Sequence, residues 1–276
     1  MTQQDFKFLQ SLMHRRAGIV LWSEKQYLAE LRLAALATEV GCDGADAVVA
    51  RVRDGDRELE LKVVEALTTS ETCFFRDIRP FEQFEGVMLP ALMKARAAVR
   101  RLRIWCSAVA SGQEAYSLAM VVARRKVELA GWRVEIVGSD LSRAMIARAM
   151  AGRYTHFEVQ RGLPIRELVE HFSRDDDGWF VSQALRDAVD FRVVNLTEDL
   201  LPPGPFDVVF CRNVLMYFDL PTKSSVLTRV ARTLAGDGYL VLGATESVVG
   251  LNAGLAPDPA NRGLYLPEHA PILQPA

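Results

Sequence analysis

The sequence has neither a long apolar run nor a strong excess of charge of one sign. Its 276 residues include 33 lysines and arginines against 35 aspartates and glutamates, a formal net charge of −2. A strongly basic nucleic-acid-binding surface is therefore disfavoured. No stretch approaches the ~20 apolar residues that cross a bilayer, and the opening MTQQDFKFLQ does not resemble a secretory signal. We expect a cytoplasmic globular protein that does not bind nucleic acid and does not insert into a membrane.

Cysteine and histidine are scarce, with four of each. No two cysteines form a CxxC pair, which argues against a disulfide framework and against a zinc knuckle. The histidines show no HExxH or similar ligand pair, so we expect no metal site. Cys106 and Cys211 end apolar runs. We interpret them as small buried hydrophobes, with a reactive thiol as the alternative.

Residues 1–67 show the periodicity of short amphipathic helices, which Gly18 and residues 41–44 interrupt. The apolar side chains at helical spacing are Phe6, Leu9, Leu12, Met13, Leu28, Leu31 and Leu36. We predict a small all-helical domain without chemistry of its own.

From about residue 100, short apolar runs alternate with helical stretches. The runs are residues 103–108, 134–137, 206–211 and 239–242. Helices are predicted over residues 114–125 and 221–235, and from an N-cap at Ser142 to Ala151. This alternation is typical of βαβ units in a mostly parallel sheet with helices on both faces. Ligands of such folds bind at the carboxyl ends of the strands.

Two parts of this second region break the alternation. Between the second and third runs, two short apolar stretches flank the Asp-Gly turn of residues 173–178, which predicts an inserted hairpin. The tail after about residue 256 is rich in proline and alanine, and we expect it to be loosely ordered.

The loop after the first run has a single glycine. Residues 110–116 (ASGQEAY) contain Gly112 but no GxGxxG pattern, and Glu114 in the first helical turn would repel a phosphate. A dinucleotide is therefore disfavoured, whereas a zwitterionic ligand whose ammonium bonds to Glu114 is favoured. The alternative is that Glu114 only compensates the helix dipole.

Polar residues also end the next two runs. Asp140 ends the second, where a carboxylate accepts both hydroxyls of a ribose or, equally well, caps the next helix. With Glu114, it points to a nucleoside that bears an amino-acid tail, a description that S-adenosylmethionine fits. Arg212 and Asn213 follow the third run, where a lone charge is costly unless it is paired or binds a ligand. The double-proline aromatic motif of many amino-group methyltransferases is missing, so a nucleobase nitrogen is a less natural acceptor.

Three longer segments resemble the CheR family, the S-adenosylmethionine-dependent methyltransferases of bacterial chemoreceptors. They are residues 68–77 (TTSETCFFRD), 105–117 (WCSAVASGQEAYS) and 206–219 (FDVVFCRNVLMYFD). Residues 16–21 (RAGIVL) resemble the opening of the family's helical domain, and residues 236–247 (GDGYLVLGATES) its last catalytic-domain strand. The similarity spans about residues 8–250 in the right order.

The resemblance implies an α/β fold: a small N-terminal all-helical domain, then a Rossmann-like class I methyltransferase domain with an inserted small antiparallel β-subdomain. We assign residues 1–67 to the helical domain and 68–99 to a linker helix region that contributes cofactor contacts. Residues 100–276 form the methyltransferase domain, with the insertion at about 152–190. The implied S-adenosylmethionine contacts are Ser70, Thr72, Arg76, Glu114, Asp140, Asn195, Leu196, Arg212 and Asn213. Ser70 stands where the family usually has asparagine.

The implied reaction transfers the methyl group to the γ-carboxylate of a receptor glutamate and leaves S-adenosyl-L-homocysteine. Since a glutamate is already ionised at neutral pH, no base is needed, and positioning and desolvation carry the catalysis. We predict that Arg76 and Tyr217 are catalytic residues that hold the acceptor. A structural salt bridge for Arg76 and packing beside Phe218 for Tyr217 are the alternatives. The implied partners are the cytoplasmic helices of methyl-accepting chemoreceptors, and the implied state is a monomer.

The sequence departs from the family pattern at several places. Gln113 and Ala115 replace the usual glutamate and proline, although Glu114 is kept. Residues 28–36 have few of the basic residues that relatives present to receptor helices, so docking is expected to use other residues. The 173–178 turn is shorter than in members that bind a receptor's C-terminal pentapeptide tether, which predicts independence from that tether. A non-catalytic module that senses S-adenosylmethionine or S-adenosylhomocysteine, and a small-molecule methyltransferase, are the alternative functions.

Overall fold

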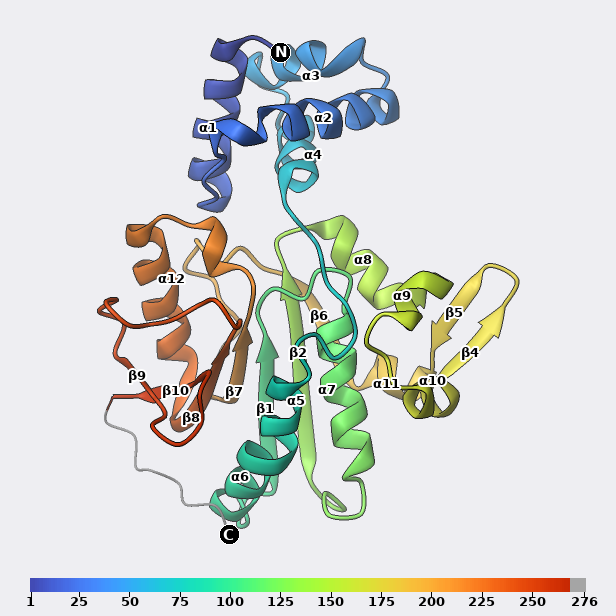
Figure 1. Cartoon of the computed structure of the whole chain (residues 1–276), viewed down its shortest axis with the longest axis vertical. Helices are drawn as coiled ribbons and strands as arrows, with labels where there is room; N and C mark the ends of the chain where they lie inside the picture. Colours follow the sequence, from blue (N-terminus) through green and yellow to red (C-terminus); the bar gives the residue numbers. More distant parts are fainter. Residues whose placement is uncertain (269–276) are drawn as a thin grey trace. The chain divides into compact units, whose positions relative to one another are not determined.

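The computed structural model describes residues 1–268, and the chain divides into two compact units (Figure 1). The first unit contains Met1–Thr69 together with Met216–Lys223, and the second contains Ser70–Leu215 and the chain from Ser224 onward. No helix of the described chain is long and apolar enough to span a membrane.

The first unit is all-helical, as predicted. Its helices are α1 (Gln3–Ala17), the short η1 (Ser23–Lys25), α2 (Gln26–Val40), α3 (Gly44–Arg53) and α4 (Arg57–Leu67). Thr2 begins α1 with a capping box, because its hydroxyl accepts from the Asp5 N–H while the Asp5 carboxylate accepts from the Thr2 N–H. Gly18, at φ 67°, ends α1 in the left-handed conformation that glycine adopts at little cost.

The buried face of α2 differs from the predicted one. Leu36 is buried and Leu28 is half-buried, but Leu31 is 56% exposed, so Leu31 does not belong to the apolar face that the periodicity indicated. The buried side chains of α2 are Ala29, Leu33, Leu36 and Ala37. Because successive helical residues turn by about 100°, Leu31 lies nearly opposite Leu33 and faces away from the core.

The second unit is built on a seven-stranded sheet in the order β6-β2-β1-β7-β8-β10-β9. Its strands are β1 (Arg101–Cys106), β2 (Arg133–Asp140), β6 (Val189–Val193), β7 (Phe206–Cys211), β8 (Leu234–Leu242), β9 (Leu255–Pro257) and β10 (Leu264–Pro267). The first five pair in parallel, and β10 runs antiparallel to β8 and β9. The four predicted strands are confirmed as β1, β2, β7 and β8.

Helices precede β1 and connect the later strands. They are α5 (Arg79–Gln83), the π-helical η2 (Phe84–Met88), α6 (Leu89–Ala95), α7 (Gln113–Arg124), α8 (Arg143–Ala151), η3 (Leu215–Tyr217) and α12 (Leu220–Thr233). Ser142 is confirmed as the N-cap of α8, because its hydroxyl accepts from the Met145 N–H at 3.2 Å.

A small subdomain is inserted between α8 and β6. It consists of β3 (Arg153–Tyr154), α9 (His156–Gln160), α10 (Ile165–His171), β4 (Phe172–Asp175), β5 (Gly178–Val181) and α11 (Gln183–Asp187). Its strands form an antiparallel sheet in the order β3-β5-β4. The predicted hairpin is therefore confirmed as β4 and β5, drawn in yellow in Figure 1.

The prediction of a loosely ordered tail was wrong for the described part of it. Residues 255–257 and 264–267 are β9 and β10, and Leu264 and Tyr265 pair with β8. Leu264 is fully buried, so apolar burial and strand pairing order this segment despite its prolines. The rest of the predicted tail, residues 269–276, lies outside the described residues.

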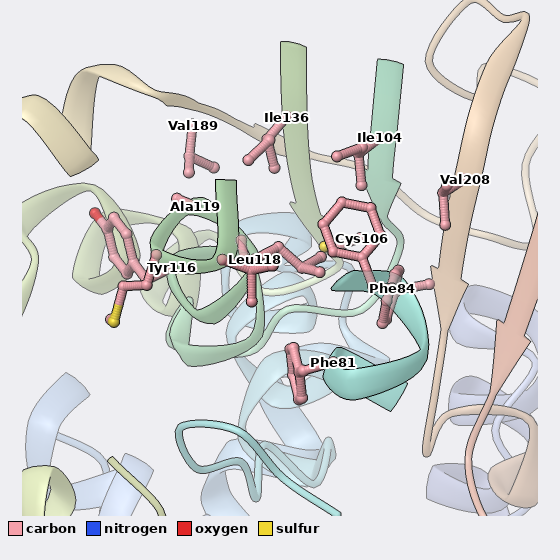
Figure 2. Close-up of a cluster of buried hydrophobic side chains, with 14 of the residues drawn as sticks. Phe81, Phe84, Ile104, Cys106, Tyr116, Leu118, Ala119, Ile136, Val189 and Val208 are labelled. Carbon is pink, nitrogen blue, oxygen red and sulfur yellow. The ribbon is translucent and has the colours of Figure 1, made fainter. Parts of the chain in front are cut away.

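One large core cluster of the second unit lies between the parallel strands and α7. Figure 2 shows Ile104 of β1, Ile136 of β2 and Val208 of β7 gathered near Leu118 of α7. Phe81 of α5 and Phe84 of η2 join this cluster (Figure 2), and both rings contact Phe210 of β7, with centroids 6.1 and 6.2 Å away. These contacts hold the start of α5, and the segment before it, close to β7.

Candidate functional site

Neighbouring parallel strands bring polar residues to one edge of the sheet. β6, β2, β1 and β7 are adjacent and parallel, so their carboxyl ends lie at the same edge. Asp140 ends β2, Asn195 follows β6, and Arg212 follows β7. Glu114 lies in the first turn of α7, which follows β1. The structure therefore gathers the residues that were chosen from the strand ends, and their contacts with a ligand stay predictions.

The loop between β1 and α7 packs tightly against its surroundings. Gly112 has φ 93°, and a Cβ on it would lie 2.8 Å from the Cβ of Ala149 in α8. Only glycine suits both this conformation and this space. The Tyr154 hydroxyl donates to the Ser111 carbonyl at 2.6 Å, so the inserted subdomain also fixes the loop.

Arg212 is the centre of a buried ion-pair network. Its Nη1 donates to Glu114 Oε2 at 2.6 Å, and its Nη2 donates to Asp77 Oδ2 at 2.7 Å and to the Arg76 carbonyl at 2.9 Å. The arginine is only 3% exposed. Charge-assisted bonds of this length are among the stronger ones in proteins, so they join β7, α7 and the segment before α5 into one structure.

The surroundings of Glu114 disfavour the ionised form of its carboxyl. Burial raises the pKa of its carboxyl above the usual value, and the neighbouring Arg212 only partly opposes that rise. No described residue donates a hydrogen bond to Glu114 Oε1. The buried Nε of Arg212 likewise has no hydrogen-bond partner among the described residues. An acceptor atom of Glu114 and a buried donor atom of Arg212 thus have no hydrogen-bond partner among the described residues, which suits a ligand with an ammonium and a carboxylate.

The segment before α5 has a strained backbone. Phe75, Asp77 and Ile78 have φ values of 47°, 67° and 50°, which are unfavourable for residues with a Cβ. The Phe75 N–H donates to Ser117 Oγ at 3.0 Å, and Arg212 holds the Arg76 carbonyl. Strain of this kind persists where surrounding contacts over-determine the conformation, which is common at functional sites. The Arg76 side chain is half-buried and donates to the Glu71 carbonyl at 2.8 Å.

Three other predicted residues make fewer contacts. The side chains of Ser70 and Thr72 are half-buried, and no described residue hydrogen-bonds to them. Tyr217 belongs to the first unit, where its carbonyl accepts from the Val20 N–H at 2.8 Å. A salt bridge, the alternative role of Arg76, is not formed with any residue in the described chain.

Asp140 links the loops after β1 and β2. Its Oδ2 accepts from the Ala110 N–H at 2.8 Å and its Oδ1 from the Ser142 N–H at 3.0 Å. The N-cap of α8 is Ser142, and Asp140 supports the start of this helix through its bond to the Ser142 N–H.

Asn195 and Leu196 follow β6 beside Asp140. The Val194 N–H donates to the Asp140 carbonyl at 2.9 Å. Asn195 Oδ1 accepts from both the N–H and the hydroxyl of Thr197, at 3.1 and 2.8 Å, which shapes a tight turn. Leu196 is 6% exposed. It therefore offers mainly an apolar surface next to the strand ends.

Asn213 lies in a turn that Glu246 organises. Asn213 has φ 56°. The Glu246 carboxylate accepts from the backbone N–H groups of Asn213, Val214 and Leu215, at 2.8, 2.9 and 2.8 Å, and from that of Gly243 at 2.8 Å.

The sequence analysis did not identify Asp77 or Glu246. Asp77 had a signal, because it directly follows Arg76 in the segment that resembles the family. Glu246 also lies in a segment that resembles the family, residues 236–247, and it follows the end of β8, the same kind of position that drew attention to Asp140. Its four backbone partners come from two loops, and no spacing rule reveals such an arrangement.

The two cysteines near this edge are buried. Cys106 and Cys211 are both fully shielded from solvent, and burial raises the pKa of both thiols, that of Cys211 to about 12. The interpretation as small hydrophobes is confirmed. Within residues 1–268, no group of three or more His, Cys, Asp or Glu side chains is arranged to hold a metal ion.

Comparison with known proteins gives consistent matches over nearly the whole chain. Residues 4–68 match the family model described as CheR methyltransferase, all-alpha domain, and residues 70–260 match CheR methyltransferase, SAM binding domain. The chain is 41% identical over 248 residues to chemotaxis protein methyltransferase 1 of Pseudomonas aeruginosa, covering 88% of this chain and 90% of that protein. It is 37% identical over 252 residues to chemotaxis protein methyltransferase Cher2 of Pseudomonas putida, covering 90% and 91%. It is 31% identical over 254 residues to the chemotaxis protein methyltransferase of Escherichia coli, covering 90% and 85%.

Proposed function

Because the chain belongs to the CheR family of S-adenosylmethionine-dependent methyltransferases, we propose that its substrates are glutamate side chains of bacterial chemoreceptors. The receiving group is the γ-carboxylate of glutamates in the receptors' cytoplasmic helices, in a chemotaxis or chemosensory-like pathway. The names of the relatives support this substrate, since they are chemotaxis protein methyltransferases that align with most of the chain.

The observation that carries the site assignment is the buried pair of Glu114 and Arg212 at the strand ends. We assign the ammonium of the methionine part to Glu114 Oε1, its carboxylate to Arg212 Nε, and the ribose hydroxyls to Asp140. Ser70, Thr72, Asn195, Leu196 and Asn213 complete the proposed contacts. When bound, S-adenosylmethionine supplies an electrophilic methyl group, whose transfer to a carboxylate oxygen gives a methyl ester and S-adenosylhomocysteine.

The acceptor needs orientation more than activation. A glutamate carboxylate is ionised at neutral pH, and none of the residues gathered around Arg212 and Asp140 is a histidine that could serve as a base. We propose that the half-buried guanidinium of Arg76 holds the acceptor carboxylate, which it can bind through two nitrogens. Tyr217 is proposed to help by hydrogen bonding through its hydroxyl.

We propose that α2 contributes little positive charge to docking on receptor helices. Arg32, the single basic residue of that helix, donates through Nη1 to the carbonyls of Leu67 and Thr68, at 3.1 and 2.9 Å. It therefore caps the end of α4. Tyr27 and Leu31, one helical turn apart, are exposed instead. The contribution of α2 to docking should accordingly depend weakly on ionic strength.

Independence from a receptor's pentapeptide tether is supported by the compact turn between β4 and β5. Asp175 Oδ1 accepts from the N–H groups of both Asp177 and Gly178, at 2.9 and 3.0 Å, so one side chain closes the turn. Titration calorimetry with a receptor C-terminal pentapeptide should give no heat of binding. Measurable affinity would contradict this part of the proposal. We further propose that the protein works in the cytoplasm as a monomer, which analytical ultracentrifugation tests for the oligomeric state.

The test of the proposed function is methylation of a purified receptor cytoplasmic fragment. The protein, S-adenosylmethionine and the fragment are incubated together, and mass spectrometry locates methyl esters on glutamates. Loss of signal in a fragment whose modified glutamates are changed to alanine confirms the acceptor. Binding of S-adenosylhomocysteine without methylation of any fragment would favour a sensing module, and methylation independent of fragments would favour a small-molecule acceptor.

A further inference from the structure

Glu246 occupies an unusual position for a carboxylate. Its two oxygens together accept from the backbone N–H groups of Asn213, Val214, Leu215 and Gly243, all at 2.8 or 2.9 Å. Consecutive N–H groups that converge on one point form an anion-binding nest. Here the anion is the Glu246 carboxylate itself, which belongs to the loop that follows β8.

The nest shapes the turn that carries two proposed ligand contacts. Asn213 is held at φ 56°, a conformation that costs free energy for a residue with a Cβ. The bond from its N–H to the Glu246 carboxylate is charge-assisted and therefore stronger than a neutral one. Arg212 precedes Asn213 directly, so the direction in which its guanidinium leaves β7 depends on how this turn is held.

The space around the carboxylate is closed on its other side. A Cβ on Gly243 would lie 2.7 Å from Glu246 Oε2 and 2.9 Å from Asn213 Nδ2. Gly243 thus allows the loops after β7 and β8 to approach each other, and the carboxylate fills the space between their N–H groups.

We infer that Glu246 is a positioning residue for the cofactor site: its carboxylate fixes the 213–215 turn so that Arg212 and Asn213 face the ligand. The inference rests on the proposed roles of Arg212 and Asn213. Glu246 itself contacts neither ligand nor acceptor in this scheme.

The test compares Glu246→Gln with a control carboxylate in β7, the strand that leads to the 213–215 turn. Glutamine keeps the size but replaces one oxygen with an NH2 group that faces backbone donors. Because two charge-assisted bonds are lost, the Kd for S-adenosylhomocysteine should rise by about ten- to a hundredfold. The control is Asp207→Asn, at the opposite end of β7. Asp207 accepts from the Arg103 N–H at 2.7 Å and from Arg96 Nε at 2.8 Å. It should lower the unfolding temperature with less than a twofold change in Kd.

A second variant keeps the inference testable if Glu246→Gln does not fold. Gly243→Ala keeps Glu246 in the sequence, but the added methyl group displaces the Glu246 carboxylate. The Kd of this variant for S-adenosylhomocysteine should therefore also rise at least tenfold. Titration calorimetry gives the Kd, and Glu246→Asp should restore part of the affinity. If wild type binds S-adenosylhomocysteine and Glu246→Gln binds within twofold of it, the inference is wrong. If wild type itself does not bind, the proposed cofactor site fails first.

Discussion

Substitutions of Glu114 and of Arg212 should have different effects on the free energy of unfolding. In Glu114→Gln, Arg212 keeps Asp77 as a counter-ion at 2.7 Å, and the new amide oxygen can still accept from Nη1. Because burial raises the pKa of Glu114, its ionised form is costly in the folded protein. The free energy of unfolding at pH 7 should therefore stay within about 1 kcal/mol of wild type or increase. Arg212→Ala instead leaves Glu114 buried without a cation, and the free energy of unfolding should fall by about 3–5 kcal/mol.

Ligand binding should follow a different pattern. Glu114→Gln replaces a charge-assisted bond to the ligand ammonium by a neutral one, a loss of about 1.5–3 kcal/mol that raises the Kd about ten- to a hundredfold. Urea unfolding measures the stabilities, and titration calorimetry with S-adenosylhomocysteine measures the Kd. Glu135→Gln is the control, since Glu135 pairs with Arg101 and Arg103 towards the amino end of the same sheet. Equal loss of stability in Glu114→Gln and Arg212→Ala, or an unchanged Kd in Glu114→Gln, would refute the reasoning.

Three further predictions follow from the site. Arg76→Ala should lower kcat for receptor methylation about a hundredfold. It should lower the free energy of unfolding by only about 1 kcal/mol, since one bond to the Glu71 carbonyl is lost. A near-normal kcat would dismiss the role of Arg76. Gly112→Ala should lower the free energy of unfolding by about 2–4 kcal/mol, from left-handed strain and from overlap with Ala149, and urea unfolding that matches wild type would contradict this. The raised pKa of Glu114 means that its stabilising contribution is present below about pH 4.5 and is lost as pH rises through the folded pKa. The stability of wild type relative to Glu114→Gln should thus fall as pH rises from about 4.5 through the folded pKa, while affinity for S-adenosylhomocysteine rises over the same range; a stability difference that does not change with pH would contradict the raised pKa.

Much of the candidate site could be predicted because the carboxyl ends of parallel strands lie at the same edge of the sheet. The rule that polar residues after such strands meet at one edge selected Glu114, Asp140, Arg212 and Asn213 from spacing alone. Ser70, Thr72 and Arg76 lie on an irregular segment without periodicity, so only the family resemblance identified them. The family matches confirm that resemblance and the predicted fold class.

The errors have identifiable physical causes. The buried face of α2 uses Ala29 and Ala37, and a search for leucines overlooks small side chains that allow helices to pack closely. The strands β9 and β10 are short and contain prolines at their ends, Pro257 and Pro267, which resemble loop signals. Their stability comes from pairing with β8, a long-range contact that local composition does not reveal.

The first unit is made of two segments that lie far apart in the sequence, which has a consequence for its synthesis on the ribosome. Residues 216–223 complete it: the Ile19 and Phe218 backbones form a bridge, and His14 Nε2 lies 3.0 Å from Asp219 Oδ2. The last of these residues emerges about 150 residues after Thr69. Because a ribosome adds about 5–20 residues per second, the N-terminal helices remain without residues 216–223 for several seconds or longer. The order of the chain therefore delays the bridge to Ile19 and the contact with His14 until most of the second unit has been made.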